Sequence, residues 1–174
     1  TSSTDATGDG KSSASSPAET GKSEAIASMR EGRQSFALVL LGDGRMLAIA
    51  GQGLGNTATY NANLNSTEMY DPSTDEWIRT GDLYAFRVNP SAVSLGSGRV
   101  LVTGGGTVDR NSTPRTEIWD PASGQWTEAA PMNQAREKMP VAVLPDGRVL
   151  VVGGADDTAQ RTFTAEIYDP ETDT

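Results

Sequence analysis

The chain has 174 residues, a formal net charge of −9 and 36% hydrophobic residues, which fits one domain of ordinary size. The acidic balance argues against a general nucleic-acid binder, because neutralising phosphates needs clustered Lys and Arg. Cysteine and histidine are both absent, so disulfides, thiolate or imidazole metal sites and Cys- or His-dependent catalytic groups are excluded within these residues. No apolar run is long enough to span a membrane.

The first segment, residues 1–22, consists mainly of Ser, Thr, Gly, Ala and Asp and contains no large apolar side chain. Such a segment cannot bury enough surface to offset the entropy of ordering, so we expect a disordered leader that acts as a tether. A stalk of this composition favours an extracytoplasmic or secreted setting.

From Met29 onward the chain repeats itself. One arginine opens each unit, and a second follows 12 residues later in a Gly-Arg pair, while a glutamate recurs every 49 residues. The opening arginines are Arg33, Arg87 and Arg136, and the glutamates are Glu68, Glu117 and Glu166. A catalytic group is normally needed once per site, so residues that recur three times at fixed spacing are interpreted as scaffold.

Each unit predicts four short strands. The first three are short runs with apolar residues, and a tight glycine turn separates the first from the second. The first strands are expected at 36–41, 91–95 and 140–144, the second at 45–50, 99–103 and 148–152, and the third at 67–70, 116–119 and 165–168. An Asp-Pro turn leads to a fourth strand, which starts at Trp77 and Trp126.

A glycine doublet follows the second strand in two units, as Gly104-Gly105 and Gly153-Gly154. In the first unit we expect Gln52 to stand where the second glycine of the doublet would be.

Arg, Asp-Gly-Arg, Gly-Gly, Tyr-Asp-Pro and Trp in this order resemble the kelch repeat, over roughly residues 29–174. The resemblance implies an all-β, kelch-type β-propeller, distantly like that of galactose oxidase, in which each repeat forms one four-stranded antiparallel blade. Blade 1 is expected at about 33–79, blade 2 at about 87–128 and blade 3 at about 136–174. The first strand of each blade would line the central channel and the Trp strand would lie at the rim.

The repeated aromatic residues are expected to pack between strands and neighbouring blades, because large aromatic rings bury the most area. They are Tyr70, Trp77, Trp119, Trp126 and Tyr168. The repeated Arg and Glu residues are expected to contact each other within or between blades, since the planar guanidinium suits a carboxylate.

Three blades are fewer than the six or seven of a typical kelch ring, so we expect a partial propeller that continues in further blades or self-associates, in one alternative as a six-bladed dimer. Residues 23–28 align with a fourth strand, with Ser23 in the place of the tryptophan. They are a possible closing strand at the rim.

If the repeats are scaffold, recognition belongs to the loops after the glycine doublets, which differ between units. The candidate binding residues in these loops are Tyr60, Asn61, Asn63, Asp109, Arg110, Arg115, Asp156, Asp157 and Arg161. Neither a catalytic constellation nor a cofactor or metal motif is apparent, and Asp156-Asp157 lacks the ligand spacing of a calcium loop.

The favoured function is a binding module with a protein partner, a glycan being a further possible ligand. The alternative is a non-catalytic portion of a galactose-oxidase-like or sialic-acid-acting enzyme whose active residues lie outside this chain. Copper-radical chemistry needs Cys, Tyr and His, of which these residues include only tyrosines.

Overall fold

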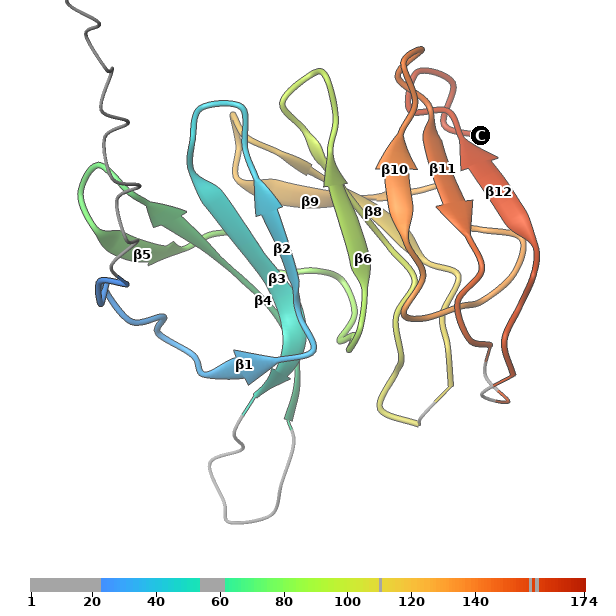
Figure 1. Cartoon of the computed structure of the whole chain (residues 1–174), viewed down its shortest axis with the longest axis horizontal. Coiled ribbons are helices and arrows are strands. Elements are labelled where there is room, and N and C mark those ends of the chain that lie inside the picture. The colour runs from blue at the N-terminus through green and yellow to red at the C-terminus, as the bar shows by residue number, and fades with distance from the viewer. Residues whose placement is uncertain (1–22, 54–61, 110, 157, 159) are drawn as a thin grey trace, which may run out of the picture.

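The computed structural model describes residues 23–53, 62–109, 111–156, 158 and 160–174, and these residues form β-structure without an assigned helix (Figure 1). The expected disordered leader, residues 1–22, lies outside the described residues. The strands fall into three separate antiparallel sheets, one for each repeat. The all-β expectation from the repeat pattern is therefore confirmed.

Blade 1 is the sheet with the order β1-β3-β4-β5, in which β2 also pairs with β3. Its strands are β1 Arg33–Gln34, β2 Ala37–Leu40, β3 Met46–Gly53, β4 Ala62–Asp71 and β5 Glu76–Arg79. The extra strand β1 arises because β3 and β4 extend beyond the expected bounds, which gives Arg33 and Gln34 a pairing partner at Gly53 and Gln52.

Blade 2 has the order β6-β7-β8-β9, and the third sheet, blade 3, has the order β10-β11-β12. The strands of blade 2 are β6 Ser91–Ser94, β7 Val100–Thr103, β8 Thr116–Asp120 and β9 Gln125–Ala129. Those of blade 3 are β10 Val141–Val143, β11 Val149–Val152 and β12 Ala165–Tyr168. In place of β1, these two blades have only isolated bridges, Val88 with Gly106 and Glu137 with Ala155.

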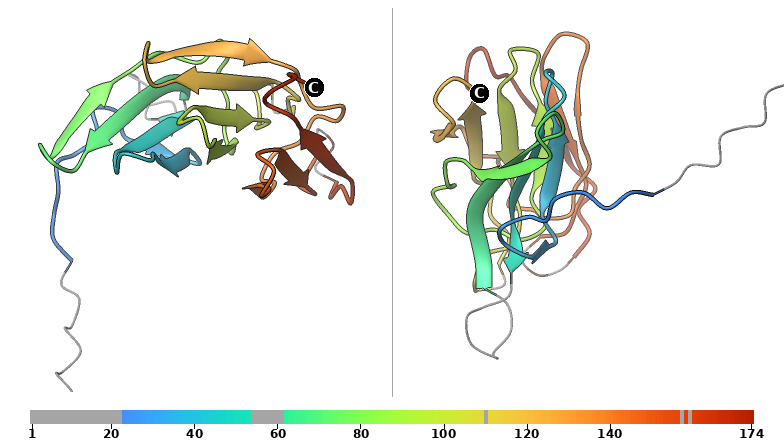
Figure 2. Two further views of the ribbon diagram at one scale, coloured as in Figure 1. Left: turned by 90° about the horizontal axis from the view of Figure 1, so that it is seen from above. Right: turned by 90° about the vertical axis from the view of Figure 1, so that its left-hand side faces the viewer.

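The three sheets stand side by side along a curve, as Figure 2 shows from above. The first strands lie next to one another, β2 against β6 and β6 against β10, on the inner side of this curve. The outer strands β5 and β9 lie away from it. This fan is the arrangement of propeller blades, with the first strands innermost as the kelch resemblance implies.

The hydrophobic core lies between the sheets. Leu47 and Ile49 of blade 1 pack with Val100, Trp119 and Trp126 of blade 2. A second cluster joins blade 2 to blade 3 through Leu101, Met139, Val149 and Val151. The second strand of each blade lies between two others, and in blades 1 and 2 it is buried on both faces, which explains its nearly uninterrupted aliphatic sequence; in blade 3 only the face of Val149 and Val151 is buried.

Backbone hydrogen bonds repeat between adjacent blades. The N–H of Gly51 donates to the carbonyl of Arg87 at 2.9 Å, and that of Gly105 donates to the carbonyl of Arg136 at 3.0 Å. The same geometry at both junctions fixes how each blade is placed on the next.

The glycine doublet of blade 1 is in a different place from the one expected. Gly104 and Gly105 have φ of 65° and 105°, and the residues with the matching pair of angles in blade 1 are Ala50 at 57° and Gly51 at 98°. The expected departure at Gln52 is therefore wrong, since the departure is Ala50 in the first position. The constant separation of 17 residues from the opening arginine to the first doublet position identifies Ala50, Gly104 and Gly153 as equivalents.

Gly104→Ala is expected to destabilise the protein much more than Gly153→Ala. Both glycines have nearly the same positive φ, 65° and 62°, so the backbone cost of alanine is common to both. A Cβ at Gly104 would clash with the carbonyl oxygen of Arg136 in blade 3, whereas at Gly153 the nearest atom is 3.4 Å away. Overpacking makes the difference in unfolding free energy about 1–3 kcal/mol, measurable by urea denaturation. Equal losses would mean that the junction between blades 2 and 3 is looser than described.

The strand bounds are compatible with the expected blade limits, while the role of residues 23–28 as a closing strand remains a prediction. Residues 23–32 have no strand assignment and lead into β1. They lie against blade 1, where Ala27 bonds with Asp75 and Trp77.

Candidate functional site

The repeated arginine and glutamate form an ion pair inside each blade. Arg33 Nη2 lies 2.7 Å from Glu68 Oε1, and Arg136 Nη2 lies 2.7 Å from Glu166 Oε1. Arg87 pairs with Glu117 in the same way, with both side chains almost completely buried. The predicted Arg–Glu contact therefore forms, and it lies within each blade.

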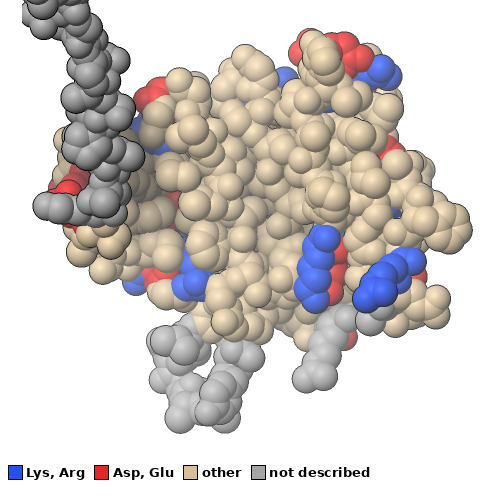
Figure 3. All heavy atoms as spheres, viewed as in Figure 1, with Lys and Arg blue, Asp and Glu red and all other residues tan. Residues whose placement is uncertain are grey.

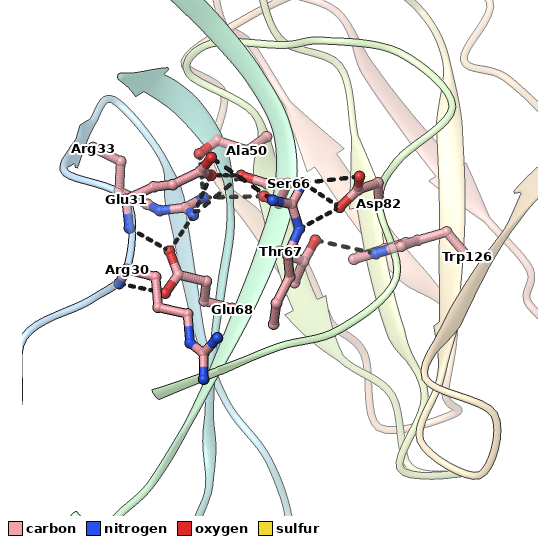
Figure 4. Close-up of polar contacts among 10 residues, drawn as sticks. Arg30, Glu31, Arg33, Ala50, Ser66, Thr67, Glu68, Asp82 and Trp126 are labelled. Atoms are coloured by element: carbon pink, nitrogen blue, oxygen red, sulfur yellow. Dashed lines mark hydrogen bonds and ion pairs between the residues drawn. The ribbon is translucent and has the colours of Figure 1, made fainter. Parts of the chain in front are cut away.

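Each arginine also bridges two backbone carbonyls. Nη1 of Arg33 donates to the carbonyls of Ala50 at 2.9 Å and Ser66 at 3.0 Å, which joins the middle of β3 to β4 (Figure 4). Nη1 of Arg87 and Nη1 of Arg136 make the equivalent pairs of bonds in blades 2 and 3. Each guanidinium thus holds together the two chain segments that carry these carbonyls, a task for which a planar fork is suited and a lysine is not.

Each glutamate holds the segment that leads into its own blade. Glu68 accepts the N–H groups of Arg30 at 2.7 Å and Glu31 at 3.1 Å, as Figure 4 shows. Glu117 accepts the N–H of Tyr84, and Glu166 accepts that of Asn133. These bonds tie each carboxylate to the backbone of its own blade, which is a structural role.

The pKa directions of the three glutamates differ for a structural reason. Burial raises the pKa of Glu117, which stands in the middle blade and accepts one backbone N–H. Burial acts in the same direction on Glu68, but bonds from Arg30, Arg33 and Glu31 outweigh it and leave the pKa of Glu68 below its ordinary value. The pKa of Glu166 is also lowered, because bonds from Asn133, Arg136 and Gln134 together exceed the effect of burial.

The lowered pKa of Glu68 predicts an acid-sensitive contribution to stability. The folded-state pKa lies below the ordinary value of 4.5, so the contribution is present above pH 4.5 and is lost as the pH falls through the folded pKa. Glu68→Gln should therefore flatten the dependence of the melting temperature on pH below 4.5. The same slope in both proteins would contradict the assignment, and Glu128→Gln, an exposed carboxylate in blade 2, is the control.

Trp119, Trp126 and Tyr168 pack at the junctions between blades as expected, whereas Tyr70 and Trp77 pack against each other within blade 1. Trp119 and Trp126 are opposite each other on β8 and β9, and both are buried in the core shared with blade 1. Tyr70 and Trp77 are opposite each other in blade 1, with ring centroids 5.2 Å apart. The hydroxyl of Tyr168 donates to Asp173 at 2.8 Å, as that of Tyr70 does to Asp75 at 2.9 Å.

The described parts of the loops after the doublets lie along one edge of the three sheets, the lower edge in Figure 1. We call this edge the loop face: residues 34–35, 62–66, 88–89, 104–109, 111–115, 137–138, 153–156 and 160–164. Of the candidate binding residues, Tyr60, Asn61, Arg110 and Asp157 lie outside the described residues. Asp109, Arg115 and Arg161 are exposed, and Asn63 is half-buried in β4.

Two of the described candidates are already engaged within the chain. Asp156 Oδ1 accepts bonds from the hydroxyl and N–H of Thr158 and from the N–H of Gln160, which close its loop. The Thr158 hydroxyl is the main reason why the pKa of Asp156 is lowered. Arg115 pairs with Glu128 at 2.5 Å, and both side chains remain more than half exposed. Asp156 is thus a loop-shaping residue, whereas Arg115 stays accessible to a ligand.

The loop face also contains residues that the sequence interpretation missed. Glu137 accepts from Asn89 Nδ2 at 3.0 Å across the junction of blades 2 and 3, and its other oxygen lies 3.2 Å from Lys138 Nζ. The Lys138 side chain is 62% exposed. The signal was present in the sequence, because the two positions after each repeated arginine are Gln34-Ser35, Val88-Asn89 and Glu137-Lys138 and differ in every unit.

The inner side of the fan is poor in charge. Figure 3 shows this side, on which charged side chains lie mainly along the edges and the middle, over β2, β6 and β10, is uncharged. Among the described residues, no group of three or more Asp or Glu side chains is arranged to hold a metal ion. No described helix has the length and apolar character needed to cross a membrane.

Comparison with known proteins bears on the repeat directly. The kelch motif matches residues 35–83, 87–133 and 138–174, one match for each sheet. No curated protein matches the chain. Since the three matches cover most of the sequence and coincide with three propeller-type sheets, the chain belongs to the kelch-repeat family.

Proposed function

We propose that this chain is a recognition module that binds another protein through the loop face. Kelch repeats are a protein-interaction module in general, and this provides the class of function. The observation that carries the proposal is that repeated and variable polar residues have different surroundings. The repeated Arg and Glu side chains are buried and bonded to each other and to the backbone, whereas several side chains that differ between repeats, such as Lys138 and Arg115, are exposed along one edge.

The loop face offers a partner both rigidity and variety. Its frame is fixed, because the N–H of Asn89 donates to the carbonyl of Ser35 at 2.7 Å and the N–H of Lys138 donates to that of Asn89 at 3.3 Å. On this frame lie the cation of Lys138, the accessible Arg115–Glu128 pair and the apolar Val108, which is 63% exposed. A polar rim with an apolar contact is the composition that protein interfaces commonly show.

Site-specific photo-crosslinking in cells that naturally contain this chain tests the proposal. Position 138 lies on the loop face, so a photoreactive residue in place of Lys138 should form crosslinks to a discrete set of partner proteins. The matched control places the same residue at Arg148, an exposed arginine at the β10–β11 turn on the opposite edge. Identical products from both positions, or none from Lys138, would refute recognition through the loop face.

We further propose an extracytoplasmic setting, which rests only on the composition of residues 1–22. Fractionation of the same cells would test it, since recovery of the chain solely from the cytosol would overturn it.

A further inference from the structure

Two exposed aromatic residues lie in the segment that leads from β5 of blade 1 into β6 of blade 2. Tyr84 is 65% exposed and Phe86 is 50% exposed, whereas Leu83 and Arg87 on either side of them are buried. Figure 1 shows this segment, in green, curving into the lower end of β6. We call these two residues the Tyr84/Phe86 pair, and they lie beside the loop face.

Hydrogen bonds fix this segment to blades 1 and 2. The N–H of Leu83 donates to the carbonyl of Asn65 at 2.9 Å, and Asn65 Nδ2 donates to the carbonyl of Leu83 at 3.0 Å. Asn65 belongs to the loop face, so the segment is joined to that face directly. The N–H of Tyr84 donates to Glu117 of blade 2 at 2.9 Å. A ligand of the Tyr84/Phe86 pair therefore meets an ordered backbone, which lowers the entropic cost of binding.

The repeat does not explain the two aromatic residues. Blade 2 has a blade on each side, and hydrophobic clusters cover both of its flanks, so the exposure of the pair belongs to the edge near the loop face. Counted back from the repeated arginine, the same two positions in blades 1 and 3 are not aromatic; they are Arg30, Gly32, Asn133 and Ala135. Exposed aromatic side chains that the scaffold does not need are typical anchors of protein interfaces.

A charged group with an excess of carboxylates lies next to Tyr84. Asp82 precedes Tyr84 by two residues, and its carboxylate lies 3.0 Å from Nη2 of Arg79. Nη1 of the same arginine lies 3.8 Å from Glu31. The three side chains are 38% to 50% exposed, so one guanidinium is shared by two accessible carboxylates.

A second charged group is reached through Glu117, which binds the N–H of Tyr84. Glu117 is opposite Glu128 in the pairing of β8 with β9, and Glu128 is paired with the exposed Arg115. Across the two groups, three accessible carboxylates are matched by two guanidinium groups, both of which already have partners. The surroundings of the pair therefore favour a cationic ligand over an anionic one, and the net charge of −9 attracts a cation from a distance as well.

We propose that the Tyr84/Phe86 pair is the anchor of the loop-face interface and binds an arginine side chain of the partner protein. This contact rests on the proposed function, and it adds the residues that anchor the partner and the side chain that they bind. A guanidinium stacks on aromatic rings and donates to carboxylates in its own plane, which an ammonium group does less well. Asp82 and Glu128 offer such carboxylates in the two charged groups.

The double variant Tyr84→Ser/Phe86→Ser, made in the chain with a photoreactive residue at position 138, tests the anchor. Both side chains are exposed, so the melting temperature should stay unchanged while the yield of crosslinks falls at least about fivefold. The control is Leu40→Ser, which removes a side chain that is 62% exposed beside the β2–β3 turn on the opposite edge. Full yield from the double variant would overturn the anchor and leave recognition through the loop face standing. Absence of crosslinks from every chain would overturn both.

NMR titration of the 174-residue chain with the peptide Gly-Arg-Gly-Arg-Gly tests the chemistry of the ligand. The ring signals of Tyr84 and Phe86 should shift and saturate. The peptide with lysines in place of the arginines should bind roughly 3- to 10-fold more weakly, and the peptide with glutamates should not move the ring signals.

The double variant keeps the net charge of −9, so attraction by charge alone would give it the same affinity for the arginine peptide. We expect its affinity, followed by backbone amide shifts, to be roughly 3- to 10-fold weaker. Ring signals that do not move, a glutamate peptide that binds as tightly as the arginine peptide, or equal affinity of the two chains would each overturn the proposal.

Discussion

Trp126→Ala is expected to lower the free energy of unfolding by about 3–5 kcal/mol. Trp126 is 3% exposed and belongs to the core that joins blades 1 and 2. Its removal leaves a large cavity and also strips Thr67 Oγ1 and the carbonyl of Gly81 of their shared donor. Urea denaturation followed by circular dichroism measures the loss.

The control for this experiment is Trp77→Ala. Trp77 is the equivalent residue of blade 1, but it is only half-buried, although its Nε1 also donates to a carbonyl, that of Ala27 at 3.0 Å. We expect a smaller loss of stability than for Trp126. A midpoint for Trp126→Ala within error of the unchanged protein would show that Trp126 is not a core residue.

Much of the fold could be predicted because it rests on short-range patterns that repeat. The expected second strand at 99–103 corresponds to β7, Val100–Thr103, since its aliphatic run fits a strand covered on both faces. The tight glycine turn between the first and second strands was also predictable, and Gly44, Gly98 and Gly147 supply positive φ there, at 91°, 80° and 89°. The Arg–Glu contact was also predictable, because its partners recur in register.

The doublet of blade 1 was misplaced because a glycine was sought where the backbone accepts an alanine. Left-handed φ is uncommon for alanine, so the sequence predicts the doublet one residue after its actual place at Ala50 and Gly51. The spacing from Arg33 was the more reliable guide. The guanidinium of Arg33 fixes this position, because it binds the backbone carbonyl of Ala50 and not the side chain of that residue.

The candidate binding residues were harder to predict, because exposure and hydrogen bonding depend on how each loop closes. Asp156 was a candidate by its charge, yet its carboxylate is taken up by the Thr158 and Gln160 bonds of its own loop. Lys138 was missed because it directly follows a repeated scaffold residue, Arg136. In the folded blade the exposed Lys138 side chain lies on the loop face and pairs with Glu137.

Arg87→Met is expected to cost about 3–5 kcal/mol, because it leaves the carboxylate of Glu117 buried without its cation. Both side chains are essentially inaccessible, at 0% and 1% exposure, and the variant also frees the carbonyls of Gly104 and Arg115. Arg136→Met is the matched comparison. Its partner Glu166 is 16% exposed, so water can solvate that carboxylate and the loss should be smaller.

The pH dependence separates a buried unpaired charge from a simple packing defect. Burial already raises the pKa of Glu117, and removing Arg87 takes away an opposing charge, so the folded-state pKa should rise further. A raised folded-state pKa gives stability that is complete below the unfolded value of 4.5 and is lost as the pH rises through the folded value. Arg87→Met should therefore be closest in stability to the unchanged protein at about pH 4.5 and become less stable relative to it as the pH rises.

Adding Glu117→Gln to Arg87→Met should remove this pH dependence while part of the loss remains, because the freed carbonyls still lack a donor. A deficit for Arg87→Met that is the same at every pH would mean that Glu117 bears no buried charge and that the arginine acts only through the two carbonyls.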